Sequence, residues 1–434
     1  MIKEEKLMKI QSGALHFYIK ERGRSVMLQM DMADPVDCAL LQKALDRTMV
    51  RYPYFRVKVV WKDDEIWLGE NDAPMIVEDS DKMRRLGSAE TGYHLVEVHG
   101  HDHAIYLHFH HGIADAGGLF PMLRTLLYTY LCDYYQQEFT PSDAVNLPDS
   151  PIDPGEYAET VPEDFLPPMD EPMVPAPEKI YALPEYELKI RKSWFVTHIS
   201  FPMKEFVDFM KRMDASPATM LSLFMCQAVD RVHPEHEEDI VTQLIWNYRD
   251  EIGVPKTYKN CAHYLYLTYS DRLKKLPLDR QGTCFRGMTY AQTGKAEAID
   301  KANMLVALGK KLETVKGFEQ KTEMFRKITG KFGKTFLTSY TGQLNLGECE
   351  EKIREMHVCT PVGLGIVLQM ASVHETISVD IMTYEDKSVY IDTFCDILRE
   401  QGVLFRRGET LAFGFPETGR TVAYDALDRD RLAE

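Results

Sequence analysis

Apolar and polar residues follow one another in the first third of the chain in patterns that predict strands separated by helices. Short alternating or apolar stretches predict strands over residues 25–32, 56–60, 65–68, 92–98 and 103–110. Apolar side chains recur at helical spacing between Asp37, which can cap a helix, and Pro53, which ends it. A second helix is expected over residues 119–131, where leucine, methionine and tyrosine fall on one helical face.

A proline-rich stretch separates this region from the rest of the chain. Ten of the 22 prolines lie between Pro141 and Pro177, and neither a packed helix nor a central strand can be built from such a stretch. We expect it to form an extended crossover between two lobes. The expected organisation is an N-terminal lobe over residues 1–140, a linker over 141–187 and a C-terminal lobe over 188–434.

The second half of the chain repeats the plan of mixed strands with helices. Its pattern predicts strands over residues 193–201, 240–248, 262–269, 334–340, 363–371 and 376–383. It predicts helices over residues 204–213, 217–232, 286–311, 316–329 and 388–401. We therefore expect an α/β (α+β) protein with two related lobes, each a mixed sheet with helices.

Length, charge and cysteine usage narrow the class of protein. A chain of 434 residues suits two domains of about 200 residues each. The net charge of −16 argues against nucleic-acid binding, which requires a basic surface. None of the eight cysteines forms a Cys-x-x-Cys pair, and the sequence contains neither an apolar signal segment nor an apolar run that could span a membrane. We expect a cytoplasmic protein without membrane or nucleic-acid partners.

Six histidines crowd the segment from residue 99 to residue 111. Clustered imidazoles occur at zinc and iron sites, but neighbours on a strand point to opposite faces, and no cysteine or carboxylate at ligand spacing accompanies these. We therefore expect no metal ion. Three of them are interpreted as polar residues of a turn or of the surface: His99, His101 and His103. Two are interpreted as packed structural residues: His108 and His110.

His111 differs from the other histidines because of the residues that follow it. Gly112 and the small residues up to Gly118 permit a tight turn and the close approach of a substrate. Asp115 stands near the start of the expected helix, where it can cap the helix or pair with a cation from the other lobe. A histidine that is held rigidly at such a turn is a candidate general base.

The segment His110-His111-Gly112-Ile113-Ala114-Asp115-Ala116 resembles the His-His-x-x-x-Asp-Gly motif of a large acyltransferase superfamily. This superfamily includes chloramphenicol acetyltransferase, the condensation domains of nonribosomal peptide synthesis, and the alcohol and polyketide acetyltransferases. The sequence departs from the motif at Ala116, where the family has glycine. Further segments resemble family motifs in order and spacing: residues 41–56, Asn247-Tyr248-Arg249 followed by Asn260, and residues 339–342.

The resemblance implies an active-site tunnel between two chloramphenicol-acetyltransferase-like lobes. His111 would take the proton from an acceptor hydroxyl or amine as that group attacks a thioester carbonyl. Asp115 would hold the loop through an ion pair with Arg249 of the second lobe. Ser339 or Thr341 would donate a hydrogen bond to the oxyanion. The residues expected to contact the substrates are His110, Gly117, Asn260 and Thr341.

The resemblance also implies a donor and an acceptor. The donor is acyl-coenzyme A as a co-substrate, with acetyl as the acyl group and no bound cofactor, and the acceptor is a small alcohol or amine. Between Lys310 and Lys334, basic residues exceed acidic ones by five, and this segment could attract the donor's phosphates or form a solvated helix face. Two alternatives stay open: a condensation-type protein that takes acyl groups from a separate carrier protein, and an inactive binding or accessory protein of the same fold.

Overall fold

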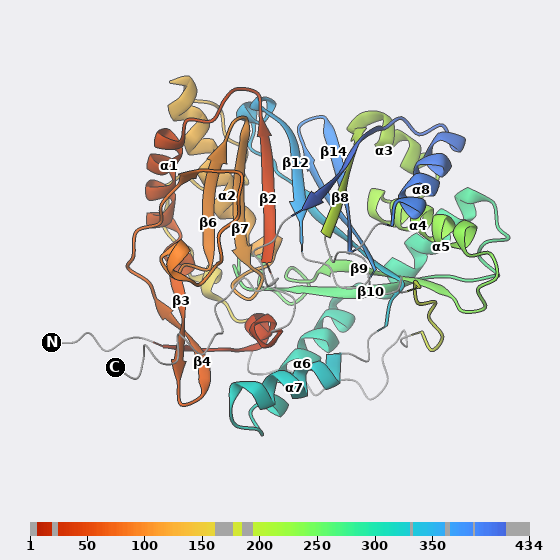
Figure 1. The fold of residues 1–434 in the computed structure, drawn as a ribbon, viewed down its shortest axis with the longest axis horizontal. Coiled ribbons are helices and arrows are strands. Elements are labelled where there is room, and N and C mark those ends of the chain that lie inside the picture. Colours follow the sequence, from red (N-terminus) through yellow and green to blue (C-terminus); the bar gives the residue numbers. More distant parts are fainter. Residues whose placement is uncertain are drawn as a thin grey trace.

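The structure is a computed structural model that describes residues 7–19, 25–160, 177–184, 194–329, 333–360, 365–384 and 387–413. In these residues the chain forms two lobes side by side, each built on a β-sheet with helices packed against it (Figure 1). This confirms the expected mixed α/β fold. Parts of the expected linker, and the first residues of the strands expected over 193–201 and 363–371, lie outside the described residues.

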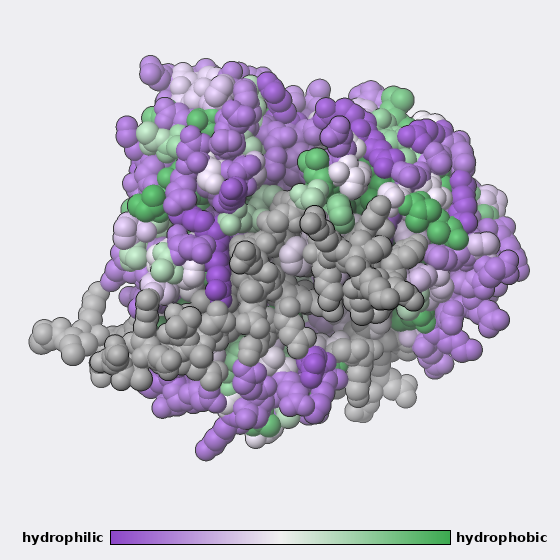
Figure 2. All heavy atoms as spheres, in the orientation of Figure 1, coloured by the Kyte–Doolittle hydropathy of each residue, from purple (hydrophilic) through white to green (hydrophobic). Residues whose placement is uncertain are grey.

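The visible surface of the described residues is mostly polar. Hydrophilic residues predominate on the face shown in Figure 2, and hydrophobic residues appear there in small groups. Among the helices that the structure describes, none has both the length and the apolar character needed to cross a bilayer. The eight cysteines are all free thiols.

The first lobe contains a five-stranded sheet with the strand order β12-β2-β7-β6-β5. Its strands are β2 (Ser25–Met32), β5 (Glu78–Asp79), β6 (Val96–His101), β7 (Ala104–His110) and β12 (Ile353–Cys359). Helices α1 (Cys38–Arg51) and α2 (Ala116–Tyr135) pack against this sheet (Figure 1). α1 begins where the Asp37 carboxylate accepts hydrogen bonds from the backbone N–H groups of Ala39 and Leu40, as the sequence predicts for a cap.

A small three-stranded sheet with the order β1-β4-β3, and several 3₁₀ turns, complete the first lobe. The strands are β1 (Met8–Lys9), β3 (Val57–Lys62) and β4 (Glu65–Glu70). The turns along the chain are η1 (Ser12–Tyr18), η2 (Pro53–Phe55), η3 (Ala89–Thr91), η4 (Pro154–Tyr157) and η5 (Glu348–Lys352). η1 is tied to the second half of the chain because Tyr18 packs against Phe318, with ring centroids 5.8 Å apart.

The second lobe contains a seven-stranded sheet with the order β10-β9-β11-β13-β14-β8-β15. Its strands are β8 (Trp194–Pro202), β9 (Ile240–Asn247), β10 (Ala262–Tyr269), β11 (Phe336–Gln343), β13 (Ile366–Val373), β14 (Thr376–Tyr384) and β15 (Arg406–Phe413). The helices of the second half of the chain are α3 (Met203–Arg212), α4 (Pro217–Val232), α5 (Leu278–Ala291), α6 (Lys295–Leu312), α7 (Phe318–Thr329) and α8 (Ser388–Glu400). Of these, α7 packs Phe318 and Phe325 into the core of the first lobe. α6 and α7 contact η1 of the first lobe, and in Figure 1 they lie below the other helices.

Three elements of the second half differ from the sequence-based expectations. The helix expected over residues 286–311 is two helices, because the chain turns at Gly294, whose φ of 137° is rarely adopted by residues with a side chain. β12 was not expected, because its polar residues give no clean alternation. β15 was not expected either, because it is a largely polar strand at the edge of its sheet, where charged residues are common.

β12 belongs to the second half of the chain by sequence and to the first lobe by pairing. It runs antiparallel to β2, with His357 opposite Gln29. β2 pairs with β7 on its other edge, so it is an interior strand only because residues 353–359 return to it. The C-terminal lobe expected over residues 188–434 therefore supplies one strand to the sheet of the other lobe.

A buried ion pair fastens the start of the expected linker to the first lobe. The Arg51 guanidinium on α1 donates to the two carboxylate oxygens of Glu156 at 2.9 and 2.5 Å, and the Tyr54 hydroxyl donates to the same carboxylate at 2.8 Å. The Arg51 and Glu156 side chains are only 3% and 9% exposed. Burial alone would raise the pKa of the Glu156 carboxyl, but these donors outweigh burial and lower that pKa.

Glu156→Gln is expected to destabilise the protein by about 3–5 kcal/mol, because it leaves the buried Arg51 charge without its counter-ion. The matched control is Asp133→Asn, which removes the more exposed partner of Arg47 one turn earlier on α1 and should cost less than about 1 kcal/mol. Urea unfolding of parent and variants measures both free energies. Because the pKa of Glu156 is lowered, the parent's advantage should be full above pH 4.5 and shrink as the pH falls through the lowered value. Equal losses in the two variants at pH 7 would contradict this account.

Candidate active site

The histidine pair stands where β7 ends, on the turn that leads into α2. His110 is buried, and its Nδ1 accepts a hydrogen bond from the backbone N–H of Gly112 at 3.0 Å. The His110 ring stacks on Phe17 of η1, with 4.3 Å between ring centroids. A Cβ at residue 112 would lie 2.5 Å from the same phenylalanine ring, so glycine is required there. His110 was expected to contact substrate, and in the structure its contacts are those of a residue that builds the turn.

His111 follows directly and is half buried. Its ring lies parallel to that of His16 in η1, with centroids 4.5 Å apart and an angle of 4° between the planes. The side-chain amide of Asn260, from the second lobe, donates to His111 Nδ1 at 3.1 Å. That amide has a fixed orientation because its oxygen accepts a hydrogen bond from the backbone N–H of Ala262 at 2.9 Å. Groups from both lobes therefore hold the His111 ring in place.

The contact with Asn260 determines which nitrogen of a neutral His111 carries the proton. An amide nitrogen can only donate, so Nδ1 of His111 accepts and the proton lies on Nε2. The basic lone pair of the ring then points at the Asn260 amide. Asn260 was expected among the substrate-binding residues, and the structure places it against the candidate base itself.

Asp115 is buried at the first turn of α2 and uses both carboxylate oxygens within the protein. Its Oδ1 accepts from the backbone N–H of Gly118 at 2.8 Å, which caps the helix, and from Arg249 Nη2 at 2.6 Å. Its Oδ2 accepts from the backbone N–H of Cys261 at 2.8 Å. Asp115 thus joins the start of α2 in the first lobe to the segment between β9 and β10 in the second.

Arg249 comes from the segment that follows β9 and is almost fully buried. In addition to Asp115, its Nη2 donates to the carbonyl oxygen of Lys259 at 3.0 Å. Burial alone would lower the pKa of the guanidinium, but Asp115 outweighs burial and raises that pKa. The structure therefore brings together Asp115 and Arg249 as a charged pair between the lobes.

Two glycines at the start of α2 let the lobes approach closely. A Cβ at residue 117 would overlap Arg249 Nη1, and a Cβ at residue 118 would overlap the backbone carbonyl oxygen of Tyr258. Gly117 was expected to contact substrate, and it instead makes room for the arginine. Ala116 is the first residue of α2, so its backbone is helical and the departure from glycine in the motif leaves the turn intact.

The two hydroxyl groups expected at the oxyanion both lie on β11. Ser339 is half buried and lies opposite Gln369 of β13. The Thr341 hydroxyl donates to the carbonyl oxygen of Met370 at 2.8 Å, so its proton is already used within the sheet. Ser339 is therefore the better of the two candidates for an oxyanion donor.

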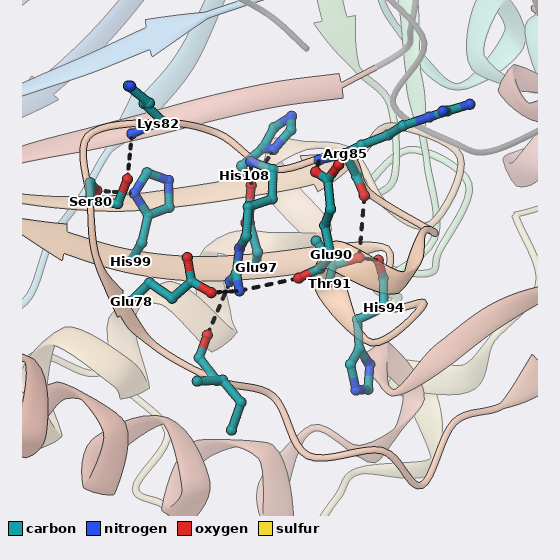
Figure 3. A network of polar contacts seen from close by, with 12 residues as sticks. Glu78, Ser80, Lys82, Arg85, Glu90, Thr91, His94, Glu97, His99 and His108 are labelled. Carbon is teal, nitrogen blue, oxygen red and sulfur yellow. Dashed lines mark hydrogen bonds and ion pairs between the residues drawn. The ribbon is translucent and has the colours of Figure 1, made fainter.

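Glu97 and His108 form a buried polar network on the first sheet, away from the turn. Glu97 Oε1 lies 2.8 Å from His108 Nδ1 (Figure 3). Arg84 Nε donates to Glu97 Oε2 at 2.7 Å. Burial alone would raise the pKa of Glu97, but His108 and Arg84 outweigh it and lower that pKa. A cavity of about 300 Å³ lies beside this network, and none of the expected site residues lines it. His108 is a structural histidine, as expected.

The other three histidines of the segment divide between the interior and the surface. His101 and His103 are exposed, as expected. His99 was expected at a turn or on the surface, and this was wrong: it is buried on β6, and its Nδ1 lies 2.6 Å from the Ser80 carbonyl oxygen. The error arose because β6 continues through residue 101, so the hairpin turn falls at residues 102–103.

Five basic residues of the segment over 310–334 lie on helices: Lys310 and Lys311 on α6, and Lys321, Arg326 and Lys327 on α7. Lys331 lies outside the described residues. One of the segment's lysines, Lys321, is buried and pairs with Glu65 of β4 at 2.9 Å, so it is not available to a ligand. Both helices contact η1, the turn that stacks His16 on His111. η1 therefore contacts both the helices that carry these basic residues and the candidate base.

His16 is the residue at this site that sequence reasoning missed. It lies far from His111 in sequence, in a 3₁₀ turn that carries no motif. The only signal was the dipeptide His16-Phe17, because these neighbours stack on the neighbours His111 and His110. Such a pairing of rings cannot be recognised before the fold is known.

Comparison with known proteins gives matches in structure only. No protein-family model and no curated protein sequence matches this chain. Polyketide synthase associated protein 5 from Mycobacterium tuberculosis matches with a TM-score of 0.58 and 11% identity, over 91% of this chain and 96% of that chain. The first condensation domain of the CDA synthetase matches with a TM-score of 0.56 and 12% identity, over 91% and 96%. TRI101 of F. sporotrichioides, complexed with coenzyme A and T-2, matches with a TM-score of 0.55 and 10% identity, over 93% and 100%.

This chain has their two-lobed fold. The condensation and acetyltransferase fold was predicted from the histidine motif, and the structural matches confirm that resemblance at the level of architecture. At 10–12% identity the matches establish the fold alone. Any activity of this protein must be argued from its own residues.

Asp115→Asn is expected to destabilise the protein by about 3–5 kcal/mol, because it leaves Arg249 buried and charged without its carboxylate. The matched control is Asp250→Asn, which removes an exposed carboxylate beside the same arginine and should cost less than about 1 kcal/mol. Chemical denaturation of both variants tests the difference. If Asp115→Asn were as stable as the parent, the pair would not hold the lobes together.

Gly118→Ala is expected to cost at least about 2 kcal/mol, because the new methyl group would overlap the Tyr258 carbonyl and force the lobes apart. Gly309→Ala on α6 is the matched control, since an added Cβ there meets nothing within 4 Å. That variant should gain up to about 1 kcal/mol from helix propensity. Thermal unfolding that ranks the two variants in the opposite order would refute the close contact.

Proposed function

We propose that this protein is an acyltransferase that moves an acyl group, preferably acetyl, from coenzyme A to a small alcohol or amine, with His111 as the general base. One observation carries the proposal. The His111 ring is held at the junction of the lobes by His16 from one side and by Asn260 from the other lobe. A rigid, half-buried imidazole with a defined tautomer is suited to proton transfer. The shared fold with acetyltransferases and condensation domains supports the reaction class.

In the proposed reaction, the acceptor hydroxyl attacks the thioester carbonyl while an imidazole nitrogen of His111 takes the hydroxyl proton. The new C–O bond and the oxyanion form together, and Ser339 is the proposed donor to that oxyanion. Collapse of the tetrahedral intermediate breaks the C–S bond, and the imidazolium returns its proton to the departing thiolate. Positioning of the two substrates contributes most of the remaining acceleration.

The tautomer of His111 places a requirement on this mechanism. The lone pair on Nδ1 faces the Asn260 amide. The acceptor must therefore displace that amide from Nδ1, or the Asn260 amide must turn away so that the proton can move from Nε2 to Nδ1 and Nε2 becomes the base. In both cases Asn260 acts as a positioning residue that responds to acceptor binding.

The donor is proposed from the position of the basic helices. α6 and α7 carry five basic residues of this segment and contact η1, whose His16 stacks on the candidate base. Cations there can attract the phosphates of coenzyme A, and the free thiols of the chain fit a cytoplasmic enzyme. A thioester on a separate carrier protein is the alternative donor, because condensation domains share the fold.

The direct test follows thiol release from acetyl-coenzyme A with a panel of alcohols and amines. His111→Ala is expected to lower kcat/KM by about 10²–10⁴-fold, the usual contribution of a general base. His103→Asn is the control, because this exposed histidine lies in the turn before β7, at the opposite end of that strand from the site, and should leave the rate unchanged.

Three outcomes would change the assignment. Transfer that is unaffected by His111→Ala would refute the general base. Transfer that occurs only from an acylated carrier protein would make this a condensation-type protein. The absence of transfer from either donor would indicate a binding or accessory protein of the same fold.

A further inference from the structure

Two histidines and a carboxylate from three strands converge where the two sheets meet. His198 lies on β8, Asp380 on β14 and His357 on β12, strands that stand together in the middle of Figure 1. Asp380 Oδ1 lies 2.5 Å from His198 Nδ1 and 2.9 Å from His357 Nδ1. Each of the three residues has one ligand atom that lies within 4.8 Å of those of the other two. Imidazole nitrogens and carboxylate oxygens are ligands that zinc and related transition metals accept.

The groups that contact these three residues are arranged like those that orient the ligands of a metal ion. Asp380 Oδ2 accepts from the backbone N–H of Val358 at 2.6 Å, which leaves Oδ1 directed at the histidines. His357 Nε2 faces the carboxylates of Asp31 at 3.5 Å and Glu355 at 3.6 Å. A histidine that binds a metal through one nitrogen commonly directs its other N–H at a carboxylate, which orients the ring and makes it more basic.

The charges around the cluster also fit a divalent cation. Three carboxylates face it, from Asp31, Glu355 and Asp380, and Arg406 pairs with Glu355. Metal-binding imidazoles are neutral, so these groups leave an excess of two negative charges that one divalent ion would balance. The Asp380 side chain is 1% exposed, whereas His198 is 25% exposed and provides a route for entry.

We propose that His198, His357 and Asp380 bind one divalent transition-metal ion of the zinc class. Three protein ligands leave the fourth position of a tetrahedral site for water. Gln29, which pairs with His357, lies four residues along β2 from the residue opposite His110, a distance of about 13 Å along the strand. The ion would therefore join the two sheets without touching a substrate at the histidine turn, and the proposal does not depend on acyl transfer.

The sequence-based expectation of no metal did not anticipate this site. Its ligands are scattered along the chain, and only the return of β12 to the first lobe brings them together. The histidine-rich segment over residues 99–111 supplies none of the three. Protons compete for the same groups: burial alone would lower the pKa of His357, but Asp380 and Asp31 raise it to about 10.

The test uses the full chain, stripped of metal with a chelator and dialysed. Zn²⁺ is titrated at pH 7.5 against a chromophoric chelator, and Co²⁺ serves as a spectroscopic probe of the ligand field. We expect one ion per chain, a visible Co²⁺ spectrum typical of four ligands, and a thermal midpoint that rises with Zn²⁺ concentration. His198→Asn removes a ligand at a partly exposed position and should weaken the affinity by more than about 100-fold. Asp31→Asn alters only an outer partner and should weaken it by about 10–100-fold.

His101→Asn is the matched control, because His101 and Asp79 form an exposed histidine–carboxylate pair of similar length, 2.9 Å. It should not change the affinity, and circular dichroism checks that every variant is folded. The proposal is wrong if the parent neither binds Zn²⁺ at micromolar concentration nor alters the Co²⁺ spectrum. It is also wrong if His198→Asn binds as tightly as the parent. In either case the cluster holds the lobes by hydrogen bonds and ion pairs alone.

Discussion

The architecture depends on one buried carboxylate, that of Asp115, which contacts both lobes. Asp115 caps α2, accepts the Cys261 amide and neutralises Arg249. The Asp115 carboxylate tolerates little displacement, because a buried charge that loses a partner is left uncompensated, which is strongly destabilising. The position of α2 therefore sets the distance between the lobes, and the turn that carries His111 is fixed as a consequence. Glycine is required at residues 117 and 118 because the second lobe approaches the start of α2 so closely there.

The candidate base is positioned by a second set of contacts that is weaker than the first. Ring stacking with His16 and one amide hydrogen bond from Asn260 orient the His111 imidazole. Neither contact involves a buried ionic pair. The strong interactions therefore lie in the scaffold, and the candidate base is held by weaker interactions that an incoming molecule could replace. Such a division would suit the proposed proton transfer, since a base that is fully bonded to its own protein cannot accept a proton.

The sequence predicted the architecture far better than it predicted the contacts. Helical periodicity and the Asp37 cap predict most helices, because these signals are local. The pairing of Asp115 with Arg249 followed from a family resemblance and not from spacing. The stacking of His16, the burial of His99 and the convergence of His198 on His357 depend on which strands become neighbours. Neighbouring strands are chosen by long-range packing, which a single sequence does not display.

The return of β12 has a consequence for the order in which the protein can fold. Until residues 353–359 leave the ribosome, β2 is an open edge with unpaired backbone groups, next to a strand that ends at the histidine turn. The first lobe therefore stays incomplete while most of the second lobe is synthesised. During this time the unpaired edge of β2 is a place where another chain could pair. A protein truncated before β12 would therefore lack a complete first lobe as well as part of the second.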